Sequence, residues 1–495
     1  MSTLLEKTHY GMMVDGKTME AASGQTFETY NPSTNEVLAT VARGGTADVD
    51  AAVLAARGAL NNAWKKTSAI KRTRLLMKLA DLMMKNLDEL ARLESLNCGK
   101  PVWASKGEIT QGIEDFEFYA GAATKITGET LVMPNNMFSY TTREPVGVCG
   151  QIVPWNYPLM MAAWKLAPAL AAGCTVILKP ASATPLTALR LGELALEAGI
   201  PPGVVNVVTG PGAEIGAYMA EHPGIDKIAF TGETETGRAI MRAAAGTMKR
   251  VTLELGGKSP NLVFEDADLT AAVNGSVFAV FYSSGQSCEA RTRIYVHEKI
   301  HDAFVADFVA KTQKLVVGDP LHEKTQIGAL ISKSHLAKVH GYVESGRTDG
   351  ATVACGGKAV VDGDLAKGNF YAPTVLTGVT QKMTVAREEI FGPVVTIAPF
   401  KTEAEALELA NDTEYGLAGT VWTTNGARAV RAAAGIKAGL ITVNQPFTGF
   451  PGVPFGGYKQ SGFGRELALD TLKLYTEQKS VVQWVGEKPL NPFGL

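Results

Sequence analysis

Short apolar segments alternate with helix-forming segments between residues 146 and 247, and this alternation restricts the fold more than any other feature of the chain. The apolar segments favour β-strands, and the segments between them have the three- and four-residue apolar spacing of helices. Strands are expected at 146–153, 175–178, 204–208 and 227–230, and helices at 158–172, 186–198, 215–221 and 238–247. Strands without polar alternation are typical of a parallel sheet that helices cover on both faces. The sequence therefore predicts an α/β fold.

A second series of the same kind follows Gly257 and predicts a second α/β domain. Its expected helices are at 269–281, 299–314 and 403–411, and its expected strands are at 292–296, 352–354, 394–399 and 440–443. Two helices are expected before the first series, at 49–60 and 72–96. The segments 128–143 and 474–484 alternate polar and apolar residues without a helical partner, so we expect a β-flap that pairs with another subunit.

Charge and cysteine content exclude several classes of protein. The formal net charge of the 495 residues is -2 with both signs interspersed, which favours neither nucleic acid nor a membrane surface as a partner. The longest apolar run, 166–178, contains Pro168 and is too short to span a bilayer, and the first residues lack the apolar core of a signal peptide. Five cysteines without a C-x-x-C pair and seven scattered histidines suggest neither a disulfide framework nor a metal site. We expect a soluble, cytoplasmic protein without a metal.

Two residues of complementary chemistry stand among small residues, Glu254 in LELGGKSP and Cys288 in SSGQSC. A thiolate attacks an electrophilic carbon, and a carboxylate can then activate the water that releases the product. With a hydride acceptor nearby the pair would oxidise an aldehyde, and without one it would act as a hydrolase. The other cysteines lack the polar, Gly/Ser-rich surroundings of Cys288 and are expected to be structural; they are at 98, 149, 174 and 355.

Two glycine patterns compete for the role of a dinucleotide-binding turn. Gly210, Gly212 and Gly216 follow an expected strand, but their spacing is one residue too long for the G-x-G-x-x-G fingerprint. The other pattern, FTGETETG, places Gly232 and Gly237 between an expected strand and a helix, where backbone amides and the helix dipole favour a pyrophosphate. Each pattern can also be a plain turn, so the residues alone leave the choice open.

Five sequence blocks resemble the NAD(P)-dependent aldehyde dehydrogenase superfamily. The blocks are PWNYP (154–158), LELGGKSP (253–260), GQSC (285–288), EEIFGPV (388–394) and PFGGYKQSGFGRE (454–466). They occur in the family's order, cover nearly the whole chain, and are most similar to the non-acylating enzymes of the broad-specificity and betaine-aldehyde or aminoaldehyde type. The resemblance implies oxidation of an aldehyde with NAD or NADP through a thiohemiacetal and a thioester on Cys288. Water activated by Glu254 would hydrolyse the thioester.

The resemblance also implies roles for individual residues. Cys288 is the nucleophile, Glu254 is the general base, and the side-chain amide of Asn156 forms an oxyanion hole with the backbone N–H of Cys288. The residues implied to bind the cofactor are Lys179, Ser182, Trp155, Gly232, Glu233, Gly237, Glu389 and Phe391. The residues implied to contact the substrate are Tyr157, Trp164, Glu289 and Phe447. The glycine pattern at Gly210 is then a loop and not the phosphate site.

The same resemblance implies two Rossmann-like, doubly wound domains and a small β oligomerisation flap. The cofactor-binding domain is expected at 1–125 and 146–256, with the first part of the flap at 126–145. The catalytic domain is expected at 257–460, and a C-terminal segment with an oligomerisation strand at 461–495. We expect a homotetramer or a homodimer, and a small-molecule aldehyde as its substrate.

Two positions depart from the family pattern. Ser182 stands where many NAD-preferring members carry a glutamate that binds the adenosine ribose, so we expect NADP to be accepted as well as NAD. Betaine aldehyde dehydrogenases usually place a tryptophan shortly after the asparagine of the C-terminal loop, whereas Asn444 is followed here by Gln445, Pro446 and Phe447. The aromatic cage for a trimethylammonium group is then incomplete. We therefore expect a broad range of aliphatic and aromatic aldehydes.

Alternatives remain open at this point. Glu289 directly follows the nucleophile, and it could either attract a cationic aminoaldehyde or pair with a nearby arginine. A CoA-acylating dehydrogenase shares the scaffold but typically lacks a glutamate at the position of Glu254. A thiol hydrolase of another class would need a histidine base, and no histidine lies in a motif near Cys288.

Overall fold

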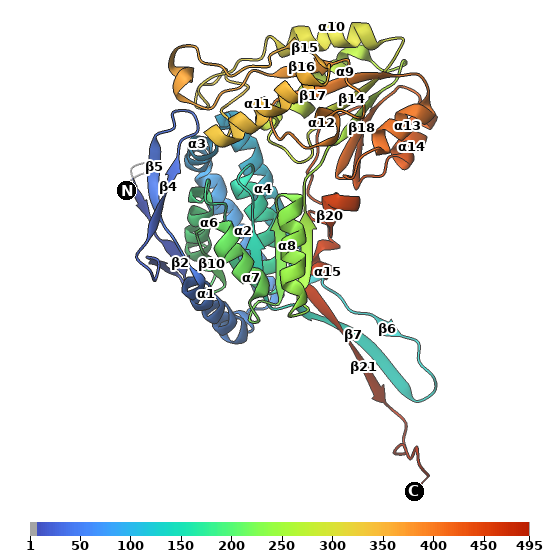
Figure 1. The fold of residues 1–495 in the computed structure, drawn as a ribbon. Coiled ribbons are helices and arrows are strands. Elements are labelled where there is room, and N and C mark those ends of the chain that lie inside the picture. Colours follow the sequence, from blue (N-terminus) through green and yellow to red (C-terminus); the bar gives the residue numbers. More distant parts are fainter. Residues whose placement is uncertain (1–6, 495) are drawn as a thin grey trace.

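The computed structural model describes residues 7–494, which form two large sheets covered by helices and a flap that extends away from them (Figure 1). The first sheet has eight strands in the order β20-β12-β11-β8-β9-β10-β2-β3, and its outer strands are β20 (Gly462–Phe463), β2 (Met12–Val14) and β3 (Lys17–Met19). Its five central strands are parallel, and they are β12 (Arg250–Glu254), β11 (Lys227–Thr231), β8 (Val148–Ile152), β9 (Thr175–Lys179) and β10 (Val205–Val207). The chain proceeds from β8 to one side and later continues at β11 on the other side. A topological switch point, where such sheets bind ligands, therefore lies between β8 and β11.

Helices cover both faces of this sheet, as the alternation of strands and helices predicts. Val176 and Leu178 of β9 face one core and Ile177 faces the other, because successive side chains of a strand point to opposite faces. The first core includes side chains of α2 (Ala69–Lys85), α4 (Val102–Ala122), α5 (Pro158–Ala172) and α6 (Leu186–Glu197). The second includes side chains of α1 (Thr46–Ala59), α7 (Ala217–Glu221) and α8 (Thr234–Ala245).

The second sheet has seven strands in the order β15-β16-β17-β14-β13-β18-β19, and all neighbours except β15 and β16 are parallel. The strands are β13 (Pro260–Val263), β14 (Arg293–His297), β15 (Thr352–Cys355), β16 (Thr374–Thr377), β17 (Val394–Phe400), β18 (Ala418–Trp422) and β19 (Leu440–Val443). Its helices are α9 (Leu269–Phe281), α10 (His301–Thr312), α11 (Lys333–Thr348), α13 (Glu403–Asn411) and α14 (Gly426–Gly435). Separate hydrophobic clusters join these helices to the sheet. The fold class predicted from the sequence is confirmed.

The flap is a three-stranded sheet of β6 (Thr130–Leu131), β7 (Met137–Pro145) and β21 (Thr476–Trp484). β21 pairs antiparallel with β7 along its whole length, so segments far apart in sequence form one ribbon (Figure 1). Leu131, Phe138 and Val482 are large apolar side chains exposed on it. No helix within residues 7–494 is long and apolar enough to cross a membrane.

The helical region before the first series differs from the sequence prediction. A single helix is predicted at 72–96, but the structure has α2 and then α3 (Leu87–Cys98), separated by Asn86. The side-chain amide of Asn86 donates to the carbonyl of Leu82 at 2.7 Å. This hydrogen bond gives a partner to a carbonyl in the last turn of α2, and the chain changes direction after it. Helix α4 is not predicted because its buried face carries Glu108 and Asp115, and these polar side chains interrupt the apolar periodicity.

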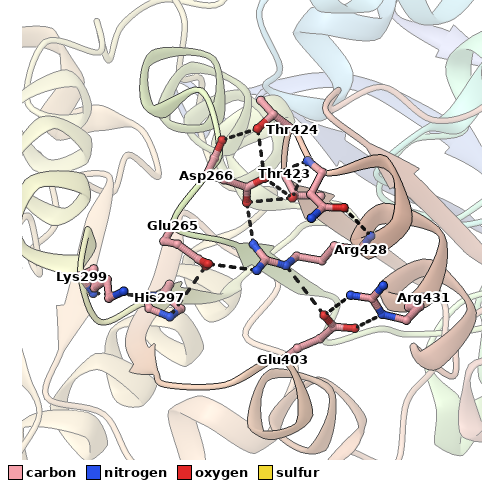
Figure 2. A network of polar contacts seen from close by, with 10 residues as sticks. Glu265, Asp266, His297, Lys299, Glu403, Thr423, Thr424, Arg428 and Arg431 are labelled. Atoms are coloured by element: carbon pink, nitrogen blue, oxygen red, sulfur yellow. Dashed lines mark hydrogen bonds and ion pairs between the residues drawn. The ribbon is translucent and has the colours of Figure 1, made fainter.

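A polar network joins α14 to the loop after β13 (Figure 2). Arg428 donates from Nη1 to Asp266 at 2.7 Å and from Nη2 to Glu265 at 2.9 Å. Asp266 also accepts hydrogen bonds from the hydroxyls of Thr423 and Thr424. Burial alone would raise the pKa of Asp266, but these hydrogen bonds and the charge of Arg428 outweigh burial and lower it.

Replacing Arg428 with methionine should lower the free energy of unfolding by about 2 kcal/mol at neutral pH, because two charge-assisted hydrogen bonds are lost. The native pKa values of Glu265 and Asp266 are depressed, so their contribution exists above the unfolded pKa and is lost as pH falls. The difference between the variant and the parent in urea denaturation should therefore shrink in acid. Arg431→Met is the matched control: the Arg431 side chain is mostly exposed, and its one ion-pair partner among residues 7–494 is Glu403. A similar loss in both variants would contradict the prediction.

Candidate active site

The site lies at the switch point of the first sheet, facing the second domain. Asn156 belongs to the loop between β8 and α5, and Glu254 is the last residue of β12. Cys288 follows α9 and a short 3-10 turn, Tyr282–Gly285. It lines two cavities, one of about 530 Å³ and one of about 420 Å³. The fold therefore brings the three residues implied to be catalytic together from three separate segments of the chain.

The loop before Cys288 has an unusual backbone. Ser283, Ser284 and Gly285 have φ values of 52°, 58° and 69°, which is the left-handed region that only glycine adopts without cost. A Cβ at Gly285 would lie 2.2 Å from the carbonyl oxygen of Gly392, so a side chain is excluded there. This tight turn places Cys288 at the wall between the two cavities.

The surroundings of Cys288 raise the pKa of its thiol and so favour the neutral form over the thiolate. Burial raises its pKa well above the usual range, and the carboxylates of Glu389 and Glu254 raise it further. The charge of Arg291 opposes this shift without reversing it. Formation of the thiolate therefore requires transfer of the proton to a base.

Glu254 is buried, and neither of its carboxylate oxygens has a hydrogen-bond partner among the described residues. Burial raises its pKa well above the usual range, and the neighbouring Glu466 adds to that effect. Lys165 forms a buried ion pair with Glu466, and its charge partly offsets the shift. The sequence does not indicate this pair, although Glu466 ends the last of the five blocks.

Asn156 is buried and its side-chain amide donates to the carbonyl of Gln286 at 2.9 Å. This contact places the amide beside the loop that carries Cys288. Its backbone carbonyl accepts a hydrogen bond from Lys100 at 2.6 Å. An amide donor and the backbone N–H of Cys288 are the kinds of group that stabilise an oxyanion.

The 420 Å³ cavity contains five of the residues implied to bind the cofactor, which are Trp155, Gly232, Glu233, Glu389 and Phe391. The rings of Trp155 and Phe391 meet edge to face, with their centroids 5.2 Å apart. Glu389 accepts a hydrogen bond from the backbone N–H of Gly257 at 3.0 Å, and burial raises its pKa to about 7. The N-terminal turn of α8 also lines this cavity.

The other three residues implied to bind the cofactor lie outside this cavity. Gly237 is within α8, and a Cβ there would meet Leu255 at 2.6 Å, so it permits close packing. Lys179 is buried at the end of β9 and donates to the carbonyl of Pro180 at 2.9 Å; burial lowers its pKa to about 8. Ser182 donates from Oγ to the carbonyl of Gly210 at 2.8 Å. The loop after β9 therefore contacts the loop after β10, which carries the first glycine pattern.

The 530 Å³ cavity contains all four residues implied to contact the substrate. Its wall also includes residues that no sequence motif indicates, among them Trp103, Phe278 and Tyr282. Ring centroids are 5.8 Å apart between Trp103 and Tyr282, 5.1 Å between Tyr282 and Phe278, and 5.3 Å between Phe278 and Phe447. A continuous aromatic surface therefore forms one wall.

Glu289 lines this cavity, but its carboxylate forms an ion pair with the fully buried Arg291. Arg291 also donates to the hydroxyl of Thr420 at 3.1 Å and to the carbonyl of Glu289 at 3.0 Å. The contacts of the Glu289 carboxylate are those of an ion pair with an arginine, which is one of the two roles expected for this residue from the sequence. Within residues 7–494 no group of three or more His, Cys, Asp or Glu side chains could hold a metal ion.

Comparison with known proteins identifies the family. Residues 19–481 match the model of the aldehyde dehydrogenase family. The chain belongs to this family. It is 46% identical over 484 residues to betaine aldehyde dehydrogenase of Bacillus subtilis, a match that covers 97% of this chain and 99% of that protein. It is 45% identical over 478 residues to an aldehyde dehydrogenase of Davidiella tassiana, covering 96% of each.

Solved structures of aldehyde dehydrogenases have the same fold. The NAD+ complex of the Bacillus cereus enzyme matches with a TM-score of 0.95 at 46% identity, covering 98% of each chain. Betaine aldehyde dehydrogenase of Staphylococcus aureus in complex with NAD+ matches with a TM-score of 0.97 at 39% identity, covering 99% of this chain and 98% of that one. The chain is therefore an NAD(P)-dependent aldehyde dehydrogenase, an enzyme that oxidises aldehydes to carboxylic acids.

Proposed function

We propose that this aldehyde dehydrogenase acts on a broad range of aliphatic and aromatic aldehydes, with Cys288 as its nucleophile. The observation that carries the proposal is the position of Cys288 between an aromatic-walled cavity and a second cavity with the features of a nicotinamide site. The aromatic wall offers apolar contact area. Arg291 pairs with Glu289, so this carboxylate is not a free anion for attracting a cationic substrate.

The 420 Å³ cavity fits a nicotinamide dinucleotide. The N-terminus of α8 presents backbone N–H groups to a pyrophosphate. Gly256 lies in the cavity wall, and a Cβ there would meet Glu389 Oε2 at 2.3 Å, so glycine leaves room for the carboxylate that would hold the nicotinamide ribose. Trp155 and Phe391 would border the ring. When bound, the nicotinamide accepts the hydride.

The acylation step joins the aldehyde to the enzyme. The sulfur of Cys288 bonds to the carbonyl carbon, and the thiol proton leaves to a base. The amide of Asn156 and the backbone N–H of Cys288 donate to the new oxyanion. The carbon then loses a hydride, the C=O bond re-forms, and a thioester remains.

The deacylation step releases the acid. Glu254 takes a proton from a water molecule, and the water oxygen bonds to the thioester carbon. The C–S bond breaks and Cys288 leaves as a thiolate. The unpartnered oxygens of Glu254 support this role because they are free to accept that proton.

A betaine-aldehyde or aminoaldehyde dehydrogenase is the second candidate, favoured by the name of the Bacillus subtilis relative. A panel of betaine aldehyde, aminoaldehydes, long-chain and aromatic aldehydes, assayed without CoA, separates the two. The broad range predicts similar kcat/KM values for the apolar aldehydes. A preference of more than about a hundredfold for a cationic aldehyde would favour the second candidate instead.

We also propose that NADP serves as well as NAD. Ser182 carries no negative charge, and Lys179 lies nearby on the adjoining strand end. Replacing Ser182 with glutamate should lower kcat/KM for NADP by at least about tenfold, because the carboxylate repels the 2′-phosphate, while kcat/KM for NAD is retained. Steady-state kinetics with both cofactors check this. A parent enzyme that prefers NAD by more than about a hundredfold would contradict the proposal.

We further propose a homodimer or homotetramer in the cytoplasm. The exposed apolar side chains of the flap, including Phe138 and Val482, support pairing with another subunit. All five cysteines are free, which supports a reducing compartment. Sedimentation velocity should give a mass of two or four chains, and Phe138→Ser with Val482→Ser should shift it toward the monomer. A monomeric parent would contradict the proposed assembly.

A further inference from the structure

Lys100 is a fully buried cation in contact with the loop that carries Asn156. It lies in the short turn between α3 and α4. Its Nζ donates to the backbone carbonyl of Asn156 at 2.6 Å, forms an ion pair with Glu108, and lies 4.5 Å from the centroid of the Tyr157 ring. Two of the three N–H donors of the ammonium group are therefore engaged in hydrogen bonds, and the Tyr157 ring adds a cation–π contact. The chemical steps described above do not use Lys100.

The turn that carries Lys100 is fixed against the catalytic domain. Gly99 has a φ of 83°, and a Cβ there would lie 2.9 Å from the carbonyl oxygen of Ala329. The backbone N–H of Ala329 donates to the carbonyl of Gly99 at 3.0 Å. The indole N–H of Trp103 donates to the carbonyl of Thr325 at 2.9 Å. The turn 99–103 is therefore bound to the segment 325–329.

The same segment holds the loop of the nucleophile. The hydroxyl of Ser284 donates to the carbonyl of Gly328 at 3.0 Å and accepts from its N–H at 3.0 Å. The N–H of Ile331 donates to the side chain of Gln286 at 3.0 Å. The turn that begins at Gly99 thus contacts Asn156 through the side chain of Lys100. The same turn also contacts the segment 325–329, which supports the Cys288 loop.

This arrangement matters because the two donors of the oxyanion hole belong to different domains. The amide comes from Asn156 after β8, and the backbone N–H comes from Cys288 after α9. Their separation depends on how the two domains are held together. We propose that Lys100 is a positioning residue that holds Asn156 at the separation from Cys288 that the oxyanion hole requires. The inference rests on the roles proposed above for Asn156 and Cys288.

The test compares variants that do not leave the Glu108 carboxylate buried without its cation. Removing Lys100 alone would leave the Glu108 carboxylate buried without its cation, which destabilises the fold. The informative pair is therefore Glu108→Gln, which keeps the lysine, against Lys100→Met with Glu108→Gln. The measured quantity is the single-turnover rate of NADH formation from a simple aldehyde. We expect the loss of Lys100 to reduce this rate by about 30- to 100-fold, because a displaced donor stabilises the transition state poorly.

The decisive comparison repeats the pair in an Asn156→Ala background. If Lys100 acts through Asn156, removing it there should change the rate less than about threefold, since no amide remains to be positioned. An equal loss in both backgrounds, or no loss in either, would overturn the inference alone. A normal rate for Asn156→Ala by itself would overturn the proposed role of Asn156 and the inference with it.

A second variant covers the case in which the double replacement does not fold. Lys100→Arg keeps the ion pair with Glu108, but its planar fork reaches the Asn156 carbonyl in a different geometry. We expect at least a tenfold loss of the single-turnover rate when Asn156 is present and less than a threefold loss when it is alanine. A loss that is independent of Asn156 would again overturn the inference.

Discussion

Replacing Cys288 with alanine should reduce aldehyde-dependent NADH formation by at least about 10⁴-fold, because no other group in the site can form the covalent intermediate. None of the other four cysteines lines either cavity, so no second thiol can replace that of Cys288. The assay follows NADH formation from a simple aldehyde without CoA at mildly alkaline pH. Cofactor affinity should be retained, because the backbone of the loop does not depend on the sulfur.

Cys355→Ala is the matched control for this variant. Cys355 is in β15, is largely buried, and is remote from both cavities. Its replacement should leave the rate of NADH formation within about twofold of the parent. A Cys288→Ala variant with more than about one per cent of the parent activity would contradict the assignment of the nucleophile.

Replacing Glu254 with glutamine should separate the two halves of the reaction. A burst of NADH of one equivalent per active site should appear, followed by a steady rate about 10²- to 10³-fold lower than that of the parent, because thioester hydrolysis loses its base. Rapid-mixing kinetics measure both phases. Absence of the burst, with hydride formation slowed to the same extent, would show that Glu254 is needed for acylation instead.

The pH dependence gives a second readout for Glu254. Burial raises the pKa of its carboxyl group well above the usual range, and Glu466 adds to that shift. The base form of Glu254 is the deprotonated one, so its fraction increases as pH rises. The steady rate of the parent should therefore increase with pH through the neutral and alkaline range, and Glu254→Gln should lose this increase.

The sequence predicts the parts of the fold in which apolar periodicity and burial agree. The strands β8, β9, β10 and β11 of the first sheet are buried along their whole length, so their apolar runs are easy to recognise. Helix α4 escapes prediction because Glu108 and Asp115 lie on its buried face, where a pattern-based argument expects apolar residues. The break at Asn86 escapes because a side-chain hydrogen bond ends α2 without a glycine or proline to mark it.

The same limit applies to the site. Asn156, Glu254 and Cys288 stand in motifs that can be recognised one by one, and the structure brings them together. Lys165 and Glu466 are 301 positions apart, and nothing in either local sequence indicates that they pair next to Glu254. Trp103 and Phe278 line the substrate cavity from helices whose local sequence carries no sign of a binding site. Residues of this kind come together only in the folded protein, so the sequence around each of them does not reveal their contacts.

The two cavities share Cys288 and only four other wall residues, Tyr157, Met161, Thr231 and Leu255, and this has a consequence for how the enzyme can diversify. One cavity takes its shape from α4, α9 and the loop near Phe447, and the other takes its shape from α8 and the loop around Glu389. Substitutions at the residues that line only one cavity can widen, narrow or recharge it without replacing a wall residue of the other. Preference for an aldehyde and preference for a cofactor are thus separable traits, and selection can alter either one while the chemistry at Cys288 is inherited unchanged.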